Sequence, residues 1–507
     1  MQDVDRTSTS DQVQGRILKS TTIIGGSSFV NILFKILQAK AVALVVGPGG
    51  VGLIGLFNSV TGLATTVSGL GIATSAVPRI AEAAAAGDDQ AVARRVFVFR
   101  RLTILLGSAS AISLFLLRRP IAQITFGNQD YVPALGLLAL VPLFLVVSAS
   151  QSGLIRAFRW IGDLARVSML GIGAGTLLGL PLLFLWGEAG IAPYLVVIAG
   201  STLLISWWYA RRIAVAPVSL PWSQVLRDSR QMVSLGFVFM VSGFASLAST
   251  YLVKVLITRQ IGLDAAGLFE ASSALANIYV GFILGAMGAD LLPHLASLAH
   301  DDLRSAGLIN TQVTIGMLLA GPGLMAILAL GPWVLTLLYS PEFTPAFAIL
   351  RWQVLGTFLR VVTWPIGYLL IARGKGRLFF GVEISTNIVY VCATVLLLTA
   401  SDWGVVSAGV AFSLMYVYLL VVITLVARRL IGFRWARNNG ILFLILLAGT
   451  LIVFAATFSS SIIVSTGLGL LVSAAMGMYA VRRLINLVGP DALYAYLQRL
   501  RLRWQRV

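Results

Sequence analysis

Two basic side chains fall in the middle of long apolar segments, where a charge is expensive. Arg360 lies within LGTFLRVVTWPIGYLLIA (355–372), and Lys35 lies within the apolar segment 20–46. A charge at the centre of a bilayer costs about 2.5–3.5 kcal/mol on insertion scales, so it normally faces protein or water. Guanidinium and ammonium groups bind phosphate through charge-assisted hydrogen bonds. These two residues are therefore the first candidates for binding an anionic substrate within a membrane.

Lys35 belongs to a polar stripe. Ser28, Asn31, Lys35 and Gln38 follow the i, i+3, i+7, i+10 spacing of one helical face. Such a face either lines a water-filled cavity or forms a hydrogen-bonded seam with a neighbouring helix. The cavity is favoured because a seam needs no net charge, and it makes Asn31 and Gln38 candidate substrate-binding residues beside Lys35.

Six further ionisable residues lie in apolar segments, closer to the segment ends. They are, as further cavity candidates, Lys40, Lys254 and Arg351, and, as candidates for coupling to a proton or sodium gradient, Glu270, Asp290 and Glu383. Structural anchoring explains each of them at least as well, because long side chains near a helix end reach the membrane surface. Basic residues dominate at depth, which favours an anionic cargo over cationic drugs.

The composition explains why these charges are embedded in apolar sequence. Of 507 residues, 58% are hydrophobic and 11% charged, and the mean hydropathy is +0.92. Long apolar runs predict an all-α polytopic membrane protein, because backbone in lipid must satisfy its hydrogen bonds internally. The net charge of +18 lies at helix ends, so no nucleic-acid partner is expected. His294 and His300 are too few for a metal site, and no cofactor is expected.

Hydropathy predicts fourteen transmembrane helices. Their ranges are 20–46, 51–77, 102–117, 132–155, 167–186, 191–210, 232–257, 265–292, 308–330, 346–372, 378–399, 404–426, 440–457 and 462–480. With the N-terminus in the cytoplasm, 29 of the 37 Lys and Arg residues fall in cytoplasmic segments. The positive-inside rule therefore predicts that both termini are cytoplasmic.

An internal repeat is the second feature of organisation. GPGGVGL from Gly47 and GLDAAGL from Gly262 align at an offset of 215, and the same offset carries Pro78 onto Pro293. Further matches are Gly87-Asp88-Asp89 with His300-Asp301-Asp302, and Pro120 and Pro133 with Pro332 and Pro345. Each half has an even number of helices, which predicts parallel six-helix bundles around a central cavity that opens alternately to the two sides.

The predicted parts of the chain follow from these boundaries. They are a cytoplasmic N-terminal segment (1–19), a first six-helix bundle (20–215), a cytoplasmic linker (216–231), a second bundle (232–430), two additional transmembrane helices (440–480) and a basic tail (487–507). In the tail, apolar residues recur at helical spacing beside arginines, which predicts an amphipathic helix on the membrane surface. No cleavable signal peptide is visible at the N-terminus.

Three stretches resemble one transporter family. They are NQDYVPALGLLALV (128–141), GPGGVGL (47–53) and FTPAFAILRWQVLGTFLRVVTWPIGYLLIARGKGRLFFGVE (343–383). They are similar to the Wzx-type flippases of O-antigen and enterobacterial common antigen, in the multidrug/oligosaccharidyl-lipid/polysaccharide (MOP) exporter superfamily, whose fold is MATE-like. The similarity runs over residues 20–430. The helices beyond it depart from the common twelve-helix pattern of that family.

The resemblance implies a cargo, a location and three residues. The cargo would be an undecaprenyl-pyrophosphate-linked oligosaccharide, moved from the inner to the outer leaflet of the bacterial inner membrane for polysaccharide or lipopolysaccharide biosynthesis. Polysaccharide polymerase and chain-length machinery are candidate partners, besides membrane lipids. The family's basic residue in the WQ-x-x-G-x-x-x-[KR] pattern falls on Arg360, its lysine before the GP turn on Lys40, and its acid on Glu383.

Two other classes of function compete with this one. A peptidoglycan-precursor flippase or a drug/cation antiporter of the same superfamily is the alternative within transport. A membrane glycosyltransferase or polymerase is the alternative among enzymes, and it needs a large external loop for catalytic acids and sugars. No predicted external loop is that large, so a transporter without enzymatic activity is expected.

Overall fold

The computed structural model describes residues 2–459 and 461–488, with side chains except at 2–29, 73–75, 226, 228–239 and 289. Within these residues the secondary structure is helical, as the sequence predicts. The longer elements are α1 (Gln2–Gly69), α2 (Ile72–Ala85), α3 (Asp89–Leu116), α6 (Leu140–Ala157), α7 (Ile161–Trp186), α8 (Ile191–Ala210), α9 (Trp222–Gln260), α10 (Leu263–Ser297), α11 (Asp302–Leu338), α12 (Ala346–Ala372), α13 (Gly376–Ala400), α14 (Val406–Ile431), α15 (Arg437–Ala456) and α16 (Ile462–Val488). The short ones are α4 (Arg118–Thr125), α5 (Val132–Leu138), η1 (Gly187–Gly190) and η2 (Pro341–Phe343).

Twelve stretches among the described residues are long and apolar enough to cross a membrane. Two of them are long, compound stretches: Val30–Gly69, of 40 residues, contains the non-helical Gly47, and Ile161–Ala210, of 50 residues, contains α7, η1 and α8. The count of fourteen transmembrane helices requires each compound stretch to cross twice, and it stays a prediction. The tail residues 489–507 lie outside the described residues.

Two boundaries differ from those predicted. Helix α1 runs from Gln2 without a break to the kink at Gly47, so position 20 is not a helix end. Helix α9 begins at Trp222, so most of the expected linker 216–231 is helical. In both cases the helix begins in a polar stretch that precedes the apolar segment. Hydropathy marks only the apolar part of such a helix.

The chain divides into two compact units. One comprises residues 1–267 with 338–340, and the other comprises 268–337 with 341–507. The division falls between Gly267 and Leu268, one helix beyond the predicted linker. The domain boundaries drawn from the repeat stay a prediction.

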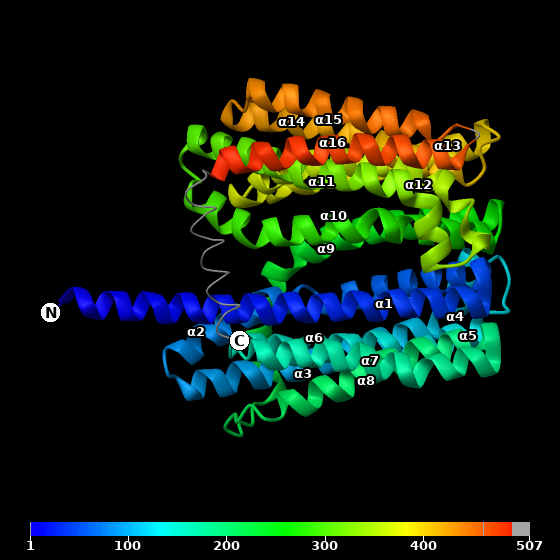
Figure 1. The fold of residues 1–507 in the computed structure, drawn as a ribbon. Coiled ribbons are helices and arrows are strands. Elements are labelled where there is room, and N and C mark those ends of the chain that lie inside the picture. Colours follow the sequence, from blue (N-terminus) through cyan, green and yellow to red (C-terminus); the bar gives the residue numbers. More distant parts are fainter. Residues whose placement is uncertain (1, 460, 489–507) are drawn as a thin grey trace, which may run out of the picture. The chain divides into compact units, whose positions relative to one another are not determined.

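In the first unit, α1, α6, α7 and α8 run alongside one another (Figure 1). Helix α2 closes this unit at one end, where Ile80, Phe99 and Leu154 from α2, α3 and α6 form a fully buried cluster. Helix α9 packs against the part of α1 that follows the kink and against α2. The elements that hold Lys35, Lys40 and Lys254 therefore belong to one packed body.

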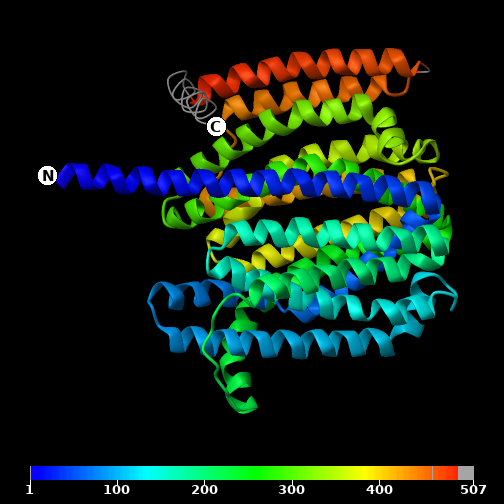
Figure 2. The same ribbon diagram turned by 60° about the horizontal axis from the view of Figure 1, so that its bottom comes forward.

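In the second unit, α12 packs against α14, and α14 packs against α13. Helices α15 and α16 lie side by side (Figure 2). Asn439 of α15 donates from Nδ2 to the backbone oxygen of Asn310 in α11 at 2.8 Å, and Thr314 donates to Asn439 Oδ1 at 2.5 Å. Helix α15, the first of the two additional helices, is thus joined to α11 by a polar network.

Equivalent residues of the proposed repeat play equivalent local roles. Asp88 accepts a hydrogen bond from the backbone nitrogen of Ala91 at 2.9 Å and caps α3. Asp301 accepts one from the backbone nitrogen of Arg304 at 2.9 Å, at the start of α11. A side-chain oxygen at this position satisfies one of the free N–H groups at a helix N-terminus.

The two glycine motifs contact each other reciprocally, within the first unit. Gly47 and Gly262 both have positive φ, 62° and 130°, which only glycine adopts readily. A Cβ on Gly52 would overlap Leu263 O and lie 2.8 Å from Gly267 N, and a Cβ on Gly267 would overlap Pro48 O and lie 3.1 Å from Gly52 N. At the offset of 215, Pro48 corresponds to Leu263 and Gly52 to Gly267. Such a self-complementary contact is the one that a two-fold axis produces, although the repeat as a whole stays a prediction.

Candidate functional site

Arg360 lies in the middle of α12, the most buried of the candidate membrane spans. Pro345 precedes this 27-residue helix. The residues on either side of Arg360, Leu359 and Val361, are buried. The Arg360 guanidinium is partly buried and donates from Nη1 to Asn277 Oδ1 of α10 at 2.5 Å. The predicted deep charge is therefore compensated by a polar side chain inside the protein and does not face lipid alone.

A second polar contact lies two turns from the first, between the same helices. Gln353 donates from Nε2 to Ser273 Oγ at 2.8 Å. Gln353 Oε1 and Thr357 Oγ1 are buried and have no hydrogen-bond partner among the described atoms. Gln353, Thr357 and Arg360 follow i, i+4, i+7 spacing, so one face of α12 presents a line of polar groups to the second unit's interior.

The other acidic and basic candidates of the second unit have distinct surroundings. Glu383 of α13 is partly buried, and both it and Arg360 act electrostatically on the Tyr416 hydroxyl of α14. Asn387 donates to the backbone oxygen of Glu383 at 2.8 Å. Arg360 and Glu383, which the family resemblance singles out, thus both lie within electrostatic range of this tyrosine.

Arg351 of α12 contacts aromatic side chains of the second unit. The Arg351 guanidinium lies over the rings of Phe347 and Phe458, 4.9 and 4.5 Å from their centroids. These contacts indicate a structural role for Arg351, because cation–π contacts stabilise a partly desolvated charge. Glu270 is partly buried and Asp290 is exposed.

The surroundings of Lys254 contradict the explanation that its side chain reaches the membrane surface. Its side chain is only 7% exposed, and Nζ donates to Gly55 O at 3.2 Å and to Ser59 Oγ at 3.1 Å in α1. An ammonium that reaches the membrane surface would not be buried between α9 and α1. The distance of Lys254 from the end of its helix therefore did not predict its position, because a backbone oxygen of α1 accepts a hydrogen bond from its ammonium.

The polar stripe on α1 divides into two kinds of residue. Asn31 donates to Ser168 Oγ at 2.7 Å and Gln38 donates to Thr176 Oγ1 at 2.6 Å, both on α7. These two amides form the interhelical seam that was the alternative to a cavity wall. Lys35 lies between them and is exposed, and Lys40 is partly buried. The side chain of Ser28 is outside the described ones.

Because Lys35 is exposed, we predict that water reaches this position of α1. In a Cys392→Ala background, we expect a cysteine at position 35 to react with a small charged thiol reagent in membranes. A cysteine at Leu33, which is 50% exposed, lies on the opposite side of α1 and should react far less because lipid covers it. Equal reaction rates at the two positions, measured by mass shift, would contradict a wet environment for Lys35.

The sequence pattern does not single out four uncharged polar residues between α10 and α12: Ser273, Asn277, Gln353 and Thr357. Neutral polar residues are common inside membrane helices as hydrogen-bonding partners, so each one alone carries little information. Their spacing is informative: Ser273 and Asn277 are four residues apart on α10, opposite the i, i+4, i+7 series on α12. A search for polar residues at helical spacing on two helices at once would have found them.

Comparison with known proteins identifies relatives over nearly the whole chain. The Polysaccharide biosynthesis protein family matches residues 17–299, more than half of the 507 residues. The Lipid III flippase of Escherichia coli K12 is 25% identical over 435 residues, covering 82% of this chain and 99% of that protein. The succinoglycan biosynthesis transport protein ExoT of Rhizobium meliloti is 28% identical over 250 residues, 48% of each chain.

Solved structures share the fold at low sequence identity. The lipid II flippase MurJ in an inward closed conformation has a TM-score of 0.69 at 12% identity, covering 92% of this chain and all of that one. An inward-facing multidrug resistance MATE transporter of the MOP superfamily has a TM-score of 0.61 at 16% identity, covering 79% and 94%. The expected MATE-like fold is therefore confirmed, and the match over residues 17–299 shows that the chain belongs to the Polysaccharide biosynthesis protein family.

Proposed function

We propose that the protein is a flippase that moves a lipid-linked oligosaccharide across the bacterial inner membrane for polysaccharide biosynthesis. The observation that carries the proposal is the alignment with the Lipid III flippase of E. coli, which extends over 99% of that protein. A multi-pass helical chain of the Polysaccharide biosynthesis protein family has the spans that such a transporter requires. The cargo is proposed to carry undecaprenyl pyrophosphate, as the resemblance of the sequence motifs implies.

Arg360 is the residue that we assign to the pyrophosphate. Its guanidinium has five N–H donors in a fork that matches phosphate oxygens, and the bond to Asn277 uses one of them. The contact with Asn277 holds the fork in place, so less side-chain freedom is lost on binding. In a poorly hydrated interior the attraction between this charge and a phosphate is much stronger than in water.

The orientation and the absence of chemistry are part of the same proposal. The charge bias supports cytoplasmic termini, and with this orientation the segment 211–221 between α8 and α9 would lie on the side where lipid-linked precursors are made. The protein then binds cargo from the inner leaflet and releases it to the outer leaflet by alternating access, without breaking a covalent bond. Glu383, near Tyr416, is our candidate for coupling this cycle to a proton or sodium gradient.

Deletion of the gene tests the function directly. We expect a lipid-linked oligosaccharide to accumulate in the inner leaflet, where a membrane-impermeant sugar-modifying reagent does not reach it in intact spheroplasts. Re-expression of the chain should restore access. Accumulation of a peptidoglycan precursor instead would support the alternative transport function, and unchanged lipid-linked intermediates would contradict both.

A further inference from the structure

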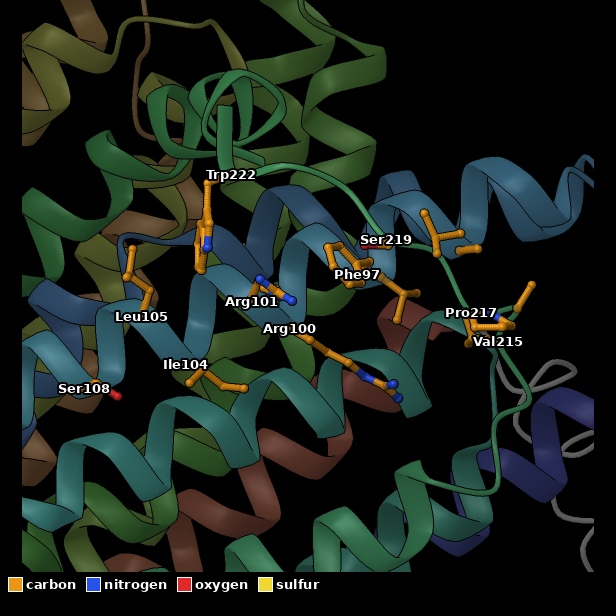
Figure 3. Close-up of a pocket in the computed structure, with 14 residues that line it drawn as sticks. Phe97, Arg100, Arg101, Ile104, Leu105, Ser108, Val215, Pro217, Ser219 and Trp222 are labelled. Atoms are coloured by element: carbon orange, nitrogen blue, oxygen red, sulfur yellow. The ribbon is translucent and has the colours of Figure 1, made fainter. Parts of the chain in front are cut away.

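A pocket of about 820 Å³ lies on the first unit, away from the charged residues discussed above. One wall is α3, with Phe97, Arg100 and Arg101, and the other is the segment 215–219 with Trp222 at the start of α9 (Figure 3). This segment connects α8 to α9 and therefore joins the two predicted six-helix halves. Neither the predicted substrate residues nor the proposed flippase cycle uses this pocket.

Arg101 is held in the pocket by two aromatic rings. Its Cζ lies 4.9 Å from the centroid of Phe97 and 5.1 Å from that of Trp222, and Figure 3 shows the guanidinium between these side chains. Arg100 directly precedes Arg101 on the same helix and also lines the pocket. Among the side chains that the structure describes, neither arginine forms an ion pair. The pocket thus concentrates two positive charges on described residues without a described carboxylate beside them.

Arg100 and Arg101 directly precede the predicted apolar span 102–117, which puts the pocket at the expected edge of the hydrocarbon core. From Arg101 to the end of α3 at Leu116 the helix rises by about 23 Å at 1.5 Å per residue, compared with a core about 30 Å thick. On the membrane side of the arginines, Ile104 and Leu105 line the pocket and are 53% and 43% exposed. Trp222 is also exposed, as expected for an indole at the membrane surface. The pocket thus has a basic end at Arg100 and Arg101 and an apolar end at Ile104 and Leu105.

We propose that this pocket binds the phosphate of an anionic phospholipid between Arg100 and Arg101, with the acyl chains over Ile104 and Leu105. Charge complementarity selects an anionic headgroup, and the adjoining apolar surface selects a lipid over free phosphate. Pockets of 300–1,000 Å³ typically enclose about one drug-sized ligand, which suits a headgroup and glycerol but not an oligosaccharide on a polyprenyl carrier. The bound lipid joins the segment 215–219 to α3.

Native mass spectrometry of the purified full-length protein tests the binding. With phosphatidylglycerol and phosphatidylethanolamine offered together, we expect the protein to retain phosphatidylglycerol preferentially. The double variant Arg100→Gln/Arg101→Gln should weaken this retention about 30-fold, from the typical contribution of a basic residue near an anionic surface. The matched control is Arg428→Gln/Arg429→Gln, an exposed consecutive pair in the last turn of α14, which should bind as the wild type does. Equal weakening in both variants, or none in the first, would overturn the proposal.

A second measurement needs no variant and identifies the lipid. A photoreactive phosphatidylglycerol should label residues 93–108 and 215–222 of the wild-type protein, and excess phosphatidylglycerol should remove the label. Labelling spread evenly over exposed helix faces would overturn the site. Removal of the label by polyprenyl pyrophosphate at lower concentration than by phosphatidylglycerol would overturn the phospholipid assignment and make the pocket a cargo site. Since both measurements report binding, their failure is independent of any failure of the flippase proposal.

Discussion

Replacement of Arg360 by alanine is expected to abolish flipping while the protein stays folded and inserted. The variant removes the charge assigned to the pyrophosphate, and loss of one partner of a buried charged pair costs about 2–5 kcal/mol. The transport rate should therefore fall at least about 30-fold at matched protein level. Arg360→Lys should retain part of the activity, because it keeps the charge and loses the planar fork. The readout is lipid-linked oligosaccharide exposed at the outer leaflet per unit time.

Two further variants separate a binding role from a structural one. Asn277→Ala keeps the charge and loses the hydrogen bond that orients it, so we expect a smaller fall in transport than in Arg360→Ala. Arg373→Ala removes an arginine just after the same helix, where its Nη2 pairs with Asp302 at 2.6 Å, and should transport as the wild type does. Wild-type polymer yield from Arg360→Ala, or equal loss in Arg373→Ala, would refute the assigned role.

Gly267→Ala is expected to have the largest effect on stability. The added Cβ would overlap the carbonyl oxygen of Pro48 and lie 3.1 Å from Gly52 N. Both neighbours are backbone, so relief requires the helices to separate rather than a side chain to rotate. Overpacking of this kind costs about 1–3 kcal/mol and occasionally more. The measurement is the Tm of detergent-purified protein, followed by the elution profile after heating.

The matched control for Gly267→Ala lies on the same helix. A Cβ on Gly281 would meet no atom within 4 Å, so Gly281→Ala should keep or raise the Tm, because alanine favours the helix over glycine. Gly52→Ala should be damaging, and the double variant with Gly267→Ala should lose less than the sum, since both disturb one contact. A wild-type Tm for Gly267→Ala would show that the close approach is not maintained in the protein.

The all-helical membrane fold and the position of Arg360 in the middle of a long helix could be predicted because both follow from the apolar segments. Residues that face hydrocarbon are predominantly apolar, so helices long enough to cross a membrane are visible in the sequence as apolar segments. Helix ends in water carry no such requirement. This is why α1 and α9 extend through polar stretches that lie before the predicted apolar segments 20–46 and 232–257.

The partners of the deep charges could not be predicted in the same way. Whether Lys254 reaches the membrane surface or Gly55 O depends on which helix lies beside α9, and helix association in membranes has no simple hydrophobic pattern. The same holds for Asn31 and Gln38, whose spacing fits a cavity wall and a seam equally well. Helix α1 approaches α7 at Gly173, where an added Cβ would lie 3.2 Å from the Phe34 ring, and the stripe itself does not reveal this approach.

The reciprocal contact of the two glycine motifs also limits how the sequence can change over evolutionary time. Because Gly52 adjoins the segment at Leu263 and Gly267 while Gly267 adjoins the segment at Pro48 and Gly52, each motif is the other's immediate environment. A drift of the first motif alters what the second must accommodate, and the reverse. The 47–53 and 262–268 segments are therefore expected to change together across homologous sequences, more closely than the helices that flank them.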